Sequence, residues 1–187
     1  MIIVTRTRRE RVLAGAVGGG VAFLLGYLVT WILAGSKVAS ATVSGPFGSA
    51  VPDWKALLWV FYDSQFVGTR TPTVTGPDGA LIGGGDLLDT VSLLGVEYLY
   101  VVPIVLLVAA GVAVTATTDA TTARDGLEAG ITVTIGYLLL AVLGLFVAAE
   151  GGIAPSPLRT AVVAGIVYPV AFGALGGAIT GYIKNRR

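Results

Sequence analysis

Four long apolar segments, separated by polar ones, form the main pattern along the chain. They cover residues 13–35, 91–117, 126–149 and 160–183, and the first of them holds no charged residue. An α-helix rises about 1.5 Å per residue, so about 20 apolar residues cross a hydrocarbon core of about 30 Å. The pattern therefore predicts an all-α membrane protein, built as a bundle of four transmembrane helices.

The polar segments complete the predicted organisation. Residues 36–90 are expected to form a small α+β domain outside the membrane, between helices 1 and 2. Residues 118–125 and 150–159 form short loops, and residues 1–12 and 184–187 are basic ends. If both termini are cytoplasmic, eight of the twelve Lys and Arg residues lie on that side, in agreement with the positive-inside rule. We therefore expect a multi-pass protein of the cell membrane with cytoplasmic N- and C-termini.

Small residues recur at every fourth position of the last apolar segment, and a similar row lies in the first. Residues four apart share one face of a helix, and in lipid a face of small residues lets another helix approach closely. Two packing partners remain open: another protein subunit, or span one against span four within the chain. The predicted helix-packing residues are Gly18, Ala22, Gly26, Gly165, Gly173, Gly177 and Gly181.

Two prolines and one carboxylate stand out within the predicted spans. Pro103 and Pro169 are expected to kink helices 2 and 4, because proline lacks a backbone N–H and clashes with the preceding turn. Glu97 lies in the outer part of the second span, and an ionisable group inside a membrane is a candidate for function. It could instead have a structural role, paired with Arg70 or Arg159.

A short aromatic helix is predicted to begin at Pro52 and Asp53, with Asp53 as its N-cap. Its aromatic residues leave two interpretations open. The helix lies at the level of the lipid headgroups and offers its aromatic side chains to the interface or a partner, or it forms the buried face of the outer domain. The residues concerned are Trp54, Trp59, Phe61 and Tyr62.

A β-hairpin is predicted after this helix. Residues 76–79 read Gly-Pro-Asp-Gly, a turn signal, and the flanking segments 71–75 and 80–82 show a weak apolar alternation. Asp86 is then expected to cap a helix that continues into the membrane as the second span.

The composition changes this picture mainly by exclusion. Only 12% of the residues are charged and the mean hydropathy is +0.85, as expected for a membrane protein. The chain has no cysteine and no histidine, which excludes disulfides, thiolate chemistry and imidazole metal ligands. A net charge of +1 gives no indication of nucleic-acid binding. No pattern of catalytic, cofactor-binding or metal-binding residues is present, so we expect no enzyme and no cofactor.

Two functions fit these observations. The first is a non-enzymatic membrane subunit that packs through its glycine-rich faces into a homo-oligomer or larger complex, with residues 36–90 as its outer contact surface. The alternative is a small transporter or channel in which the kinked helices 2 and 4 move and Glu97 is the coupling group. The first is favoured, because the spans lack a polar stripe that could line a water path.

The spans are rich in alanine, valine and glycine, and residues 117–122 read Thr-Thr-Asp-Ala-Thr-Thr. In this composition the chain resembles small uncharacterised four-span membrane proteins of halophilic archaea. The order of segments also looks like that of claudin-type proteins, with a large first outer loop containing Leu58 and Trp59, although the cysteine pair of that family is missing. The archaeal resemblance implies a four-span membrane protein and assigns no functional residue.

Overall fold

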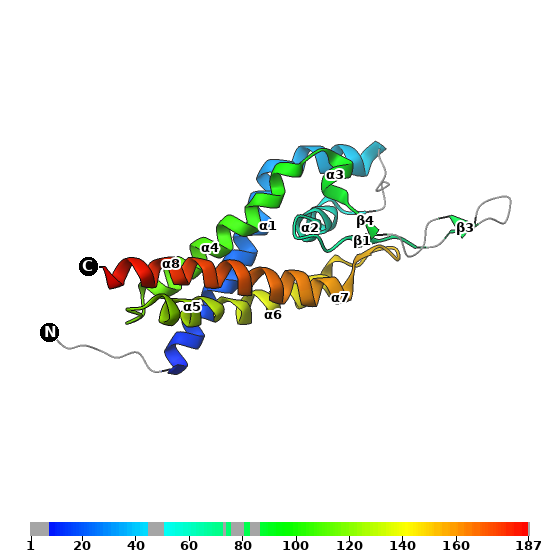
Figure 1. Ribbon diagram of the computed structural model, residues 1–187. Coiled ribbons are helices and arrows are strands. Elements are labelled where there is room, and N and C mark those ends of the chain that lie inside the picture. Colours follow the sequence, from blue (N-terminus) through cyan, green and yellow to red (C-terminus); the bar gives the residue numbers. More distant parts are fainter. Residues whose placement is uncertain (1–7, 45–50, 73, 76–80, 83–86, 187) are drawn as a thin grey trace.

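The computed structural model describes residues 8–44, 51–72, 74–75, 81–82 and 87–186 (Figure 1). Four helical segments are long and apolar enough to cross a membrane: Arg9–Val43, Glu97–Ala116, Ala123–Ala148 and Pro157–Asn185. They correspond to the four predicted apolar segments, so the chain is a membrane protein with four candidate spans. A small β-structure accompanies them at one end of the molecule.

The first span, α1, runs from Arg8 to Ser44 and is longer than the predicted 13–35. Its last part continues as a helix because residues 36–44 contain neither glycine nor proline and pack on the rest of the protein. Val38 and Ala41 are buried, and the Thr42 hydroxyl donates to the Asp53 carboxylate at 2.5 Å. The helix therefore extends beyond the membrane segment and covers the domain that follows it.

The second span is broken where a continuous helix over 91–117 was expected. A short helix, α3 (Thr90–Leu94), ends at Gly95, which adopts the left-handed conformation with φ 62° that favours glycine. A 3-10 turn, η1 (Glu97–Tyr100), then leads into α4 (Val101–Ala116). Asp89 caps α3, whereas Asp86 lies outside the described residues. Pro103 lies in the first turn of α4, directly after the change from 3-10 to α-helical geometry, where the missing N–H has few helical bonds to lose.

The third span has two parts, α5 (Ala123–Ile131) and α6 (Val133–Ala148), which meet at Thr132. Thr122 begins α5 as its N-cap, and its hydroxyl accepts the backbone N–H of Asp125 at 3.1 Å. The Thr132 hydroxyl donates to the carbonyl of Ala129 at 2.6 Å, a local bond that competes with the regular helical pattern. The predicted span 126–149 thus begins three residues too late and contains a discontinuity.

The fourth span contains wide helical turns around its proline. After α7 (Pro157–Arg159), two π-helical segments, η2 (Thr160–Val167) and η3 (Pro169–Gly173), precede α8 (Ala174–Asn185). In an α-helix the ring of Pro169 would clash with the carbonyl of Gly165, four residues earlier. A π-helix bonds over five residues, so its wider turn moves that carbonyl away. The disturbance predicted at Pro169 takes this form.

The β-structure joins the long segment between spans one and two to the loop between spans three and four. Strand β1 (Thr69–Arg70) pairs with β4 (Leu87–Leu88) on one side and β5 (Ala154–Pro155) on the other, both antiparallel. A separate pair, β2 (Val74–Thr75) and β3 (Leu81–Ile82), confirms the predicted hairpin, whose turn at 76–79 lies outside the described residues.

The spans form two groups that diverge toward one end of the molecule (Figure 1). The third and fourth spans run alongside each other, while α1 and α4 rise away from them at an angle. In the opening between the two groups lies α2 (Asp53–Asp63), viewed nearly along its axis. We call this end, with α2, α3 and the strands, the loop end. The opposite end, where α1 begins and α8 ends, is the terminal end.

Candidate functional site

The glycine row of span four is in direct contact with the backbone of span three. A side-chain carbon at Gly177 would collide with the carbonyl of Gly126, and one at Gly173 would lie 2.8 Å from the carbonyl oxygen of Gly130. One turn further on, Gly181 lies against the carbonyl of Thr122. These three predicted packing residues therefore form a contact within the chain. On one side are η3 and α8 of span four, and on the other is α5 of span three.

The π-helical turns explain how so long a row can stay on one face. An α-helix has 3.6 residues per turn, so each four-residue step rotates a residue by about 40° around the axis. From Gly165 to Gly181 the accumulated drift would be about 160° in a regular α-helix. Turns of more than four residues drift in the opposite sense. Five of the six positions of the row are accordingly buried, and Ala161 at its start is partly buried; the five are Gly165, Pro169, Gly173, Gly177 and Gly181.

The row predicted in span one packs on other partners. Gly18 faces Val114 of α4, and Gly26 faces the Phe61 ring of α2. Ala22 is also buried. The helix α1 packs on α6, α4 and α2, whereas α8 packs on α5 and α4. The expected packing of the span-one row on the span-four row is therefore wrong, because each row meets helices that lie between them.

The closest approach of α1 to another span uses glycines outside the predicted row. A side-chain carbon at Gly19 would collide with the carbonyl of Val133, and one at Gly136 would collide with the carbonyl of Ala16. Gly15 likewise lies directly against Thr132. The glycine run at residues 18–20 does include Gly19, which makes this contact. The every-fourth-residue pattern, however, picked out Gly18, which lies on the neighbouring edge of the helix.

Helix α2 is buried between the two groups of spans. Trp59, Phe61 and Tyr62 are fully buried. The Trp59 indole donates to the carbonyl of Ala148 at 2.9 Å, and the Tyr62 hydroxyl donates to that of Ala141 at 2.6 Å. Of the two interpretations, the buried face therefore fits these three aromatic residues, whose side chains are not available to lipid or a partner. Trp54 at the start of the helix is 39% exposed and is the one of the four that a lipid or partner could reach.

The far end of α2 brings polar groups into an aromatic core. The Phe23 ring of α1 packs against Phe61, Tyr62 and Tyr137, with centroid separations of 5.1 to 6.1 Å. The Tyr137 hydroxyl donates to the Gln65 side-chain oxygen at 2.8 Å, and both residues are buried. Tyr137 lies near the middle of the third candidate span. A satisfied polar pair thus lies well inside the membrane segment.

Asp63, the last residue of α2, was missed by the sequence analysis. It is 2% exposed, and it accepts hydrogen bonds from the backbone N–H and hydroxyl of Thr90 at 2.9 and 2.6 Å and from the Thr69 hydroxyl at 3.1 Å. Burial raises the pKa of Asp63 to about 7, against the lowering effect of these hydrogen bonds. Thr69 and Thr90 lie 6 and 27 residues further along the chain, outside the helix that Asp63 terminates, so no helical pattern marks the residue.

Glu97 is exposed at the start of the second candidate span. Within the described part of the chain, the ion pairs are Lys55 with Glu150 at 2.6 Å and Arg124 with Glu128 at 3.5 Å. The expected pairing of Glu97 with Arg70 or Arg159 is therefore absent among these residues.

No cluster of carboxylates suited to a metal ion occurs among the residues that the structure describes. The polar contacts at the loop end instead hold segments together. Lys55 donates to the carbonyl of Ala149 at 3.0 Å as well as to Glu150, and Lys37 donates to the carbonyl of Gly95 at 2.7 Å. These contacts fix α2 and α3 to the spans.

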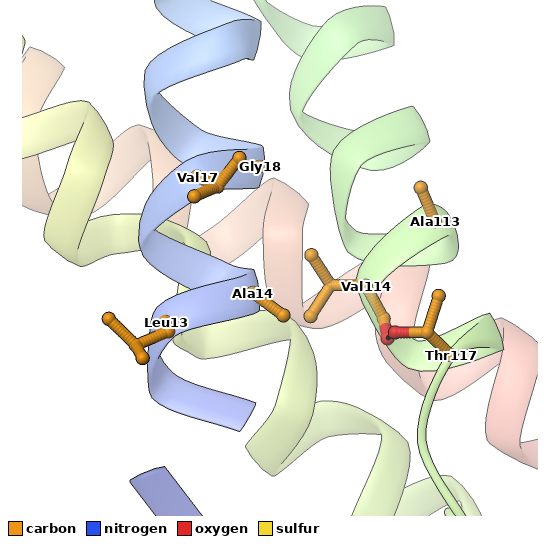
Figure 2. Close-up of a pocket in the computed structure, with 7 residues that line it drawn as sticks. All are labelled: Leu13, Ala14, Val17, Gly18, Ala113, Val114 and Thr117. Atoms are coloured by element: carbon orange, nitrogen blue, oxygen red, sulfur yellow. Dashed lines mark hydrogen bonds between the residues drawn. The ribbon is translucent and has the colours of Figure 1, made fainter. Parts of the chain in front are cut away.

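A groove of about 430 Å³ lies between α1 and α4 near the terminal end (Figure 2). Ala14 and Val114 point toward each other across it. Its lining is almost entirely apolar and includes small residues from both helices. The residues that line it are Leu13, Ala14, Val17, Gly18, Ala113, Val114 and Thr117.

Comparison with known proteins identifies a family that covers nearly the whole chain. The model of a family of unknown function, DUF7978, matches residues 4–184. The chain belongs to this family. The match includes all four candidate spans, α2 and the strands of the loop end. No curated protein sequence and no solved structure matches the chain.

Proposed function

We propose that this protein is a non-enzymatic integral membrane subunit that associates with a second copy of itself through the groove between α1 and α4. The groove carries this proposal because it is a face with small residues that no part of the described chain fills. The glycines of span four are already in contact with span three, and Gly18 is in contact with Val114 of α4, which leaves the edge of α1 with Ala14 and Val17 for assembly.

The surface around the groove is complementary to itself. Leu13 and Val17 form a ridge along one side and are 60% and 66% exposed. The groove beside them is floored by small side chains such as Ala14 and Ala113. In a twofold dimer the same patch meets itself, so the ridge of each copy would enter the groove of the other. Close packing of this kind is what favours helix association in lipid.

A cell-membrane location with both termini in the cytoplasm is part of the proposal. The terminal end carries the basic residues Arg9, Arg11, Arg124, Lys184 and Arg186, and the positive-inside rule places such an end in the cytoplasm. The groove would then lie in the cytoplasmic half of the membrane. In the described part of residues 36–90, the predicted contact surface includes exposed side chains such as Trp54 and Phe66.

Assembly is favoured over the transport alternative by the positions of the acidic residues. In the candidate spans of the described chain, Glu10, Glu97, Asp125 and Glu128 are exposed and lie near span ends. Transport through the protein would require polar groups along a continuous path, whereas α1 and α6 are in backbone contact at Gly19 and Gly136.

The cysteine-free chain allows a direct test by cross-linking in membranes. A Val17→Cys variant should form a disulfide-linked dimer, because residue 17 of one copy would lie near residue 17 of the other. Adding Ala113→Leu, which fills the groove from an exposed position, should abolish that dimer. Ala171→Leu, an equal change at an exposed position of the fourth span, serves as the control. Cross-linking that is absent, or equally sensitive to both leucine changes, would refute the proposed interface.

A further inference from the structure

One buried carboxylate joins three segments at the loop end. Asp63 terminates α2, and its oxygens accept hydrogen bonds from Thr69 of β1 and Thr90 of α3. Both threonines are as deeply buried as Asp63 itself. The end of α2 is therefore tied to β1 and α3 through the carboxylate of this one side chain.

The ionised form of Asp63 is poorly compensated by its surroundings. As the last residue of α2 it lies at the negative end of the helix dipole. Among the described ion pairs, none includes Asp63. A cavity of about 130 Å³ beside it is also lined by Asp89 and Arg159, and Arg159 is exposed to solvent.

The remaining charged and titratable neighbours do not neutralise it. Asp89 adds a like charge. Burial opposes ionisation of Asp89, but hydrogen bonds from Tyr100, Ser92 and Val91 lower its pKa, so it stays charged. Tyr100 donates its hydroxyl to Asp89 at 2.5 Å. Arg70 on β1 is exposed.

We propose that Asp63 is a proton-binding site that couples the pH at the loop end to how firmly α2 is held between the spans. When Asp63 is neutral, its hydroxyl can donate to a threonine oxygen and no charge is buried. When Asp63 is ionised, the threonines and the N–H of Thr90 remain its only described donors, and the negative charge is unpaired. The protonated protein is thus the one in which α2 is held more firmly.

The direction of the pH effect follows from the raised pKa. An aspartate in an unfolded chain has a pKa of about 3.9, whereas that of Asp63 in the fold is about 7. The folded state binds the extra proton between these values, so stability falls as the pH rises through this range. The stabilisation is fully present below the unfolded pKa and is lost as the pH passes the folded one.

Thermal unfolding in mild detergent tests the proposal, because a chain without histidine has few other groups that titrate near neutrality. The melting temperature of the wild type should fall between about pH 5 and about pH 8. Asp63→Asn should remove this dependence. Asp89→Asn is the matched change, and it should move the transition to lower pH, because it removes a like charge and leaves Asp63 in place.

A second variant and a local probe allow the proposal to be tested even if the Asp63→Asn protein does not fold. Thr69→Val removes one donor to the ionised carboxylate and should move the transition to higher pH. Ser64→Cys introduces a thiol at a fully buried position next to Asp63. The rate at which this thiol is labelled should increase with pH as α2 loosens. When Thr69→Val is added, the increase should begin at a higher pH, because the transition is shifted. The proposal is overturned if Asp63→Asn keeps the wild-type pH dependence, or if Thr69→Val and Asp89→Asn leave the transition unmoved.

Discussion

Three consecutive glycines of α1 allow the backbone contact between spans to be tested by a single methyl group. Gly18, Gly19 and Gly20 differ in what an added side-chain carbon would meet. At Gly19 it would collide with the carbonyl oxygen of Val133. At Gly20 its nearest neighbour is the end of the Leu140 side chain, 3.6 Å away, an ordinary contact distance. The same substitution at adjacent positions should therefore have opposite effects.

The expected magnitudes combine two terms. Replacing glycine by alanine in a helix contributes about 1 kcal/mol of stability through backbone entropy, and this term is common to all three positions. Overpacking a close contact costs about 1–3 kcal/mol, with the upper end expected at Gly19, because a helix carbonyl cannot rotate away. Gly19→Ala should thus destabilise the fold by about 2 kcal/mol, while Gly20→Ala should stabilise it by up to about 1 kcal/mol.

Gly18→Ala should fall between these two variants. Its added carbon would lie 2.8 Å from a methyl group of Val114, which is the end of a side chain at the edge of the groove and can move. The overpacking and propensity terms should then nearly cancel. This ordering distinguishes the structure from the sequence pattern, which places Gly18 rather than Gly19 in the packing row.

The assay is reversible unfolding in mixed detergent and SDS micelles, followed by tryptophan fluorescence. A difference of about 3 kcal/mol between Gly19→Ala and Gly20→Ala corresponds to roughly a hundredfold change in the folding equilibrium constant. Equal stabilities for these two variants would show that α1 does not touch the backbone of α6. The greatest loss at Gly18 would instead support the every-fourth-residue row as the contact.

Three further substitutions test contacts that hold the spans and α2. Lys184→Met removes an ammonium that donates to three carbonyls at and after the end of α4, at 2.8–3.1 Å; it should lower the free energy of unfolding by about 1.5–3 kcal/mol in the same SDS titration. Tyr62→Phe removes the hydroxyl that bonds Ala141 and should cost about 1 kcal/mol, measured as a lower melting temperature. Glu150→Gln breaks the ion pair with Lys55, in which the Glu150 side chain is 38% exposed. The free energy of unfolding should fall by less than about 1 kcal/mol, and the loss should disappear at high salt. A larger loss that does not depend on salt would contradict this.

Much of the fold could be predicted because membrane segments are marked locally. Each span is a continuous apolar run, and lipid requires such a run to satisfy its own backbone hydrogen bonds as a helix. The hairpin at β2 and β3 was likewise predictable, since its turn residues are adjacent in sequence. Small residues at helical spacing mark faces with few side chains, and in the fold Gly177 and Gly181 lie against the backbone of span three.

The candidate site could be predicted only in part, because a helix pattern does not name its partner. The rows of spans one and four looked equivalent, yet the structure places Gly177 against span three and Gly26 against α2. The apolar character of α2 fits a headgroup-level helix and a buried one equally well. Its burial depends on an opening formed by spans that are distant from it in the sequence.

The amino-acid sequence by itself thus determined how many segments can enter a membrane, because transfer into lipid depends on the side chains of each segment alone. Only the tertiary structure decided which glycine meets which carbonyl, and that Asp63 would be enclosed by Thr69 and Thr90. The physical reason is that close approach and charge burial depend on groups brought together from distant parts of the chain. An isolated segment contains no information about those neighbours.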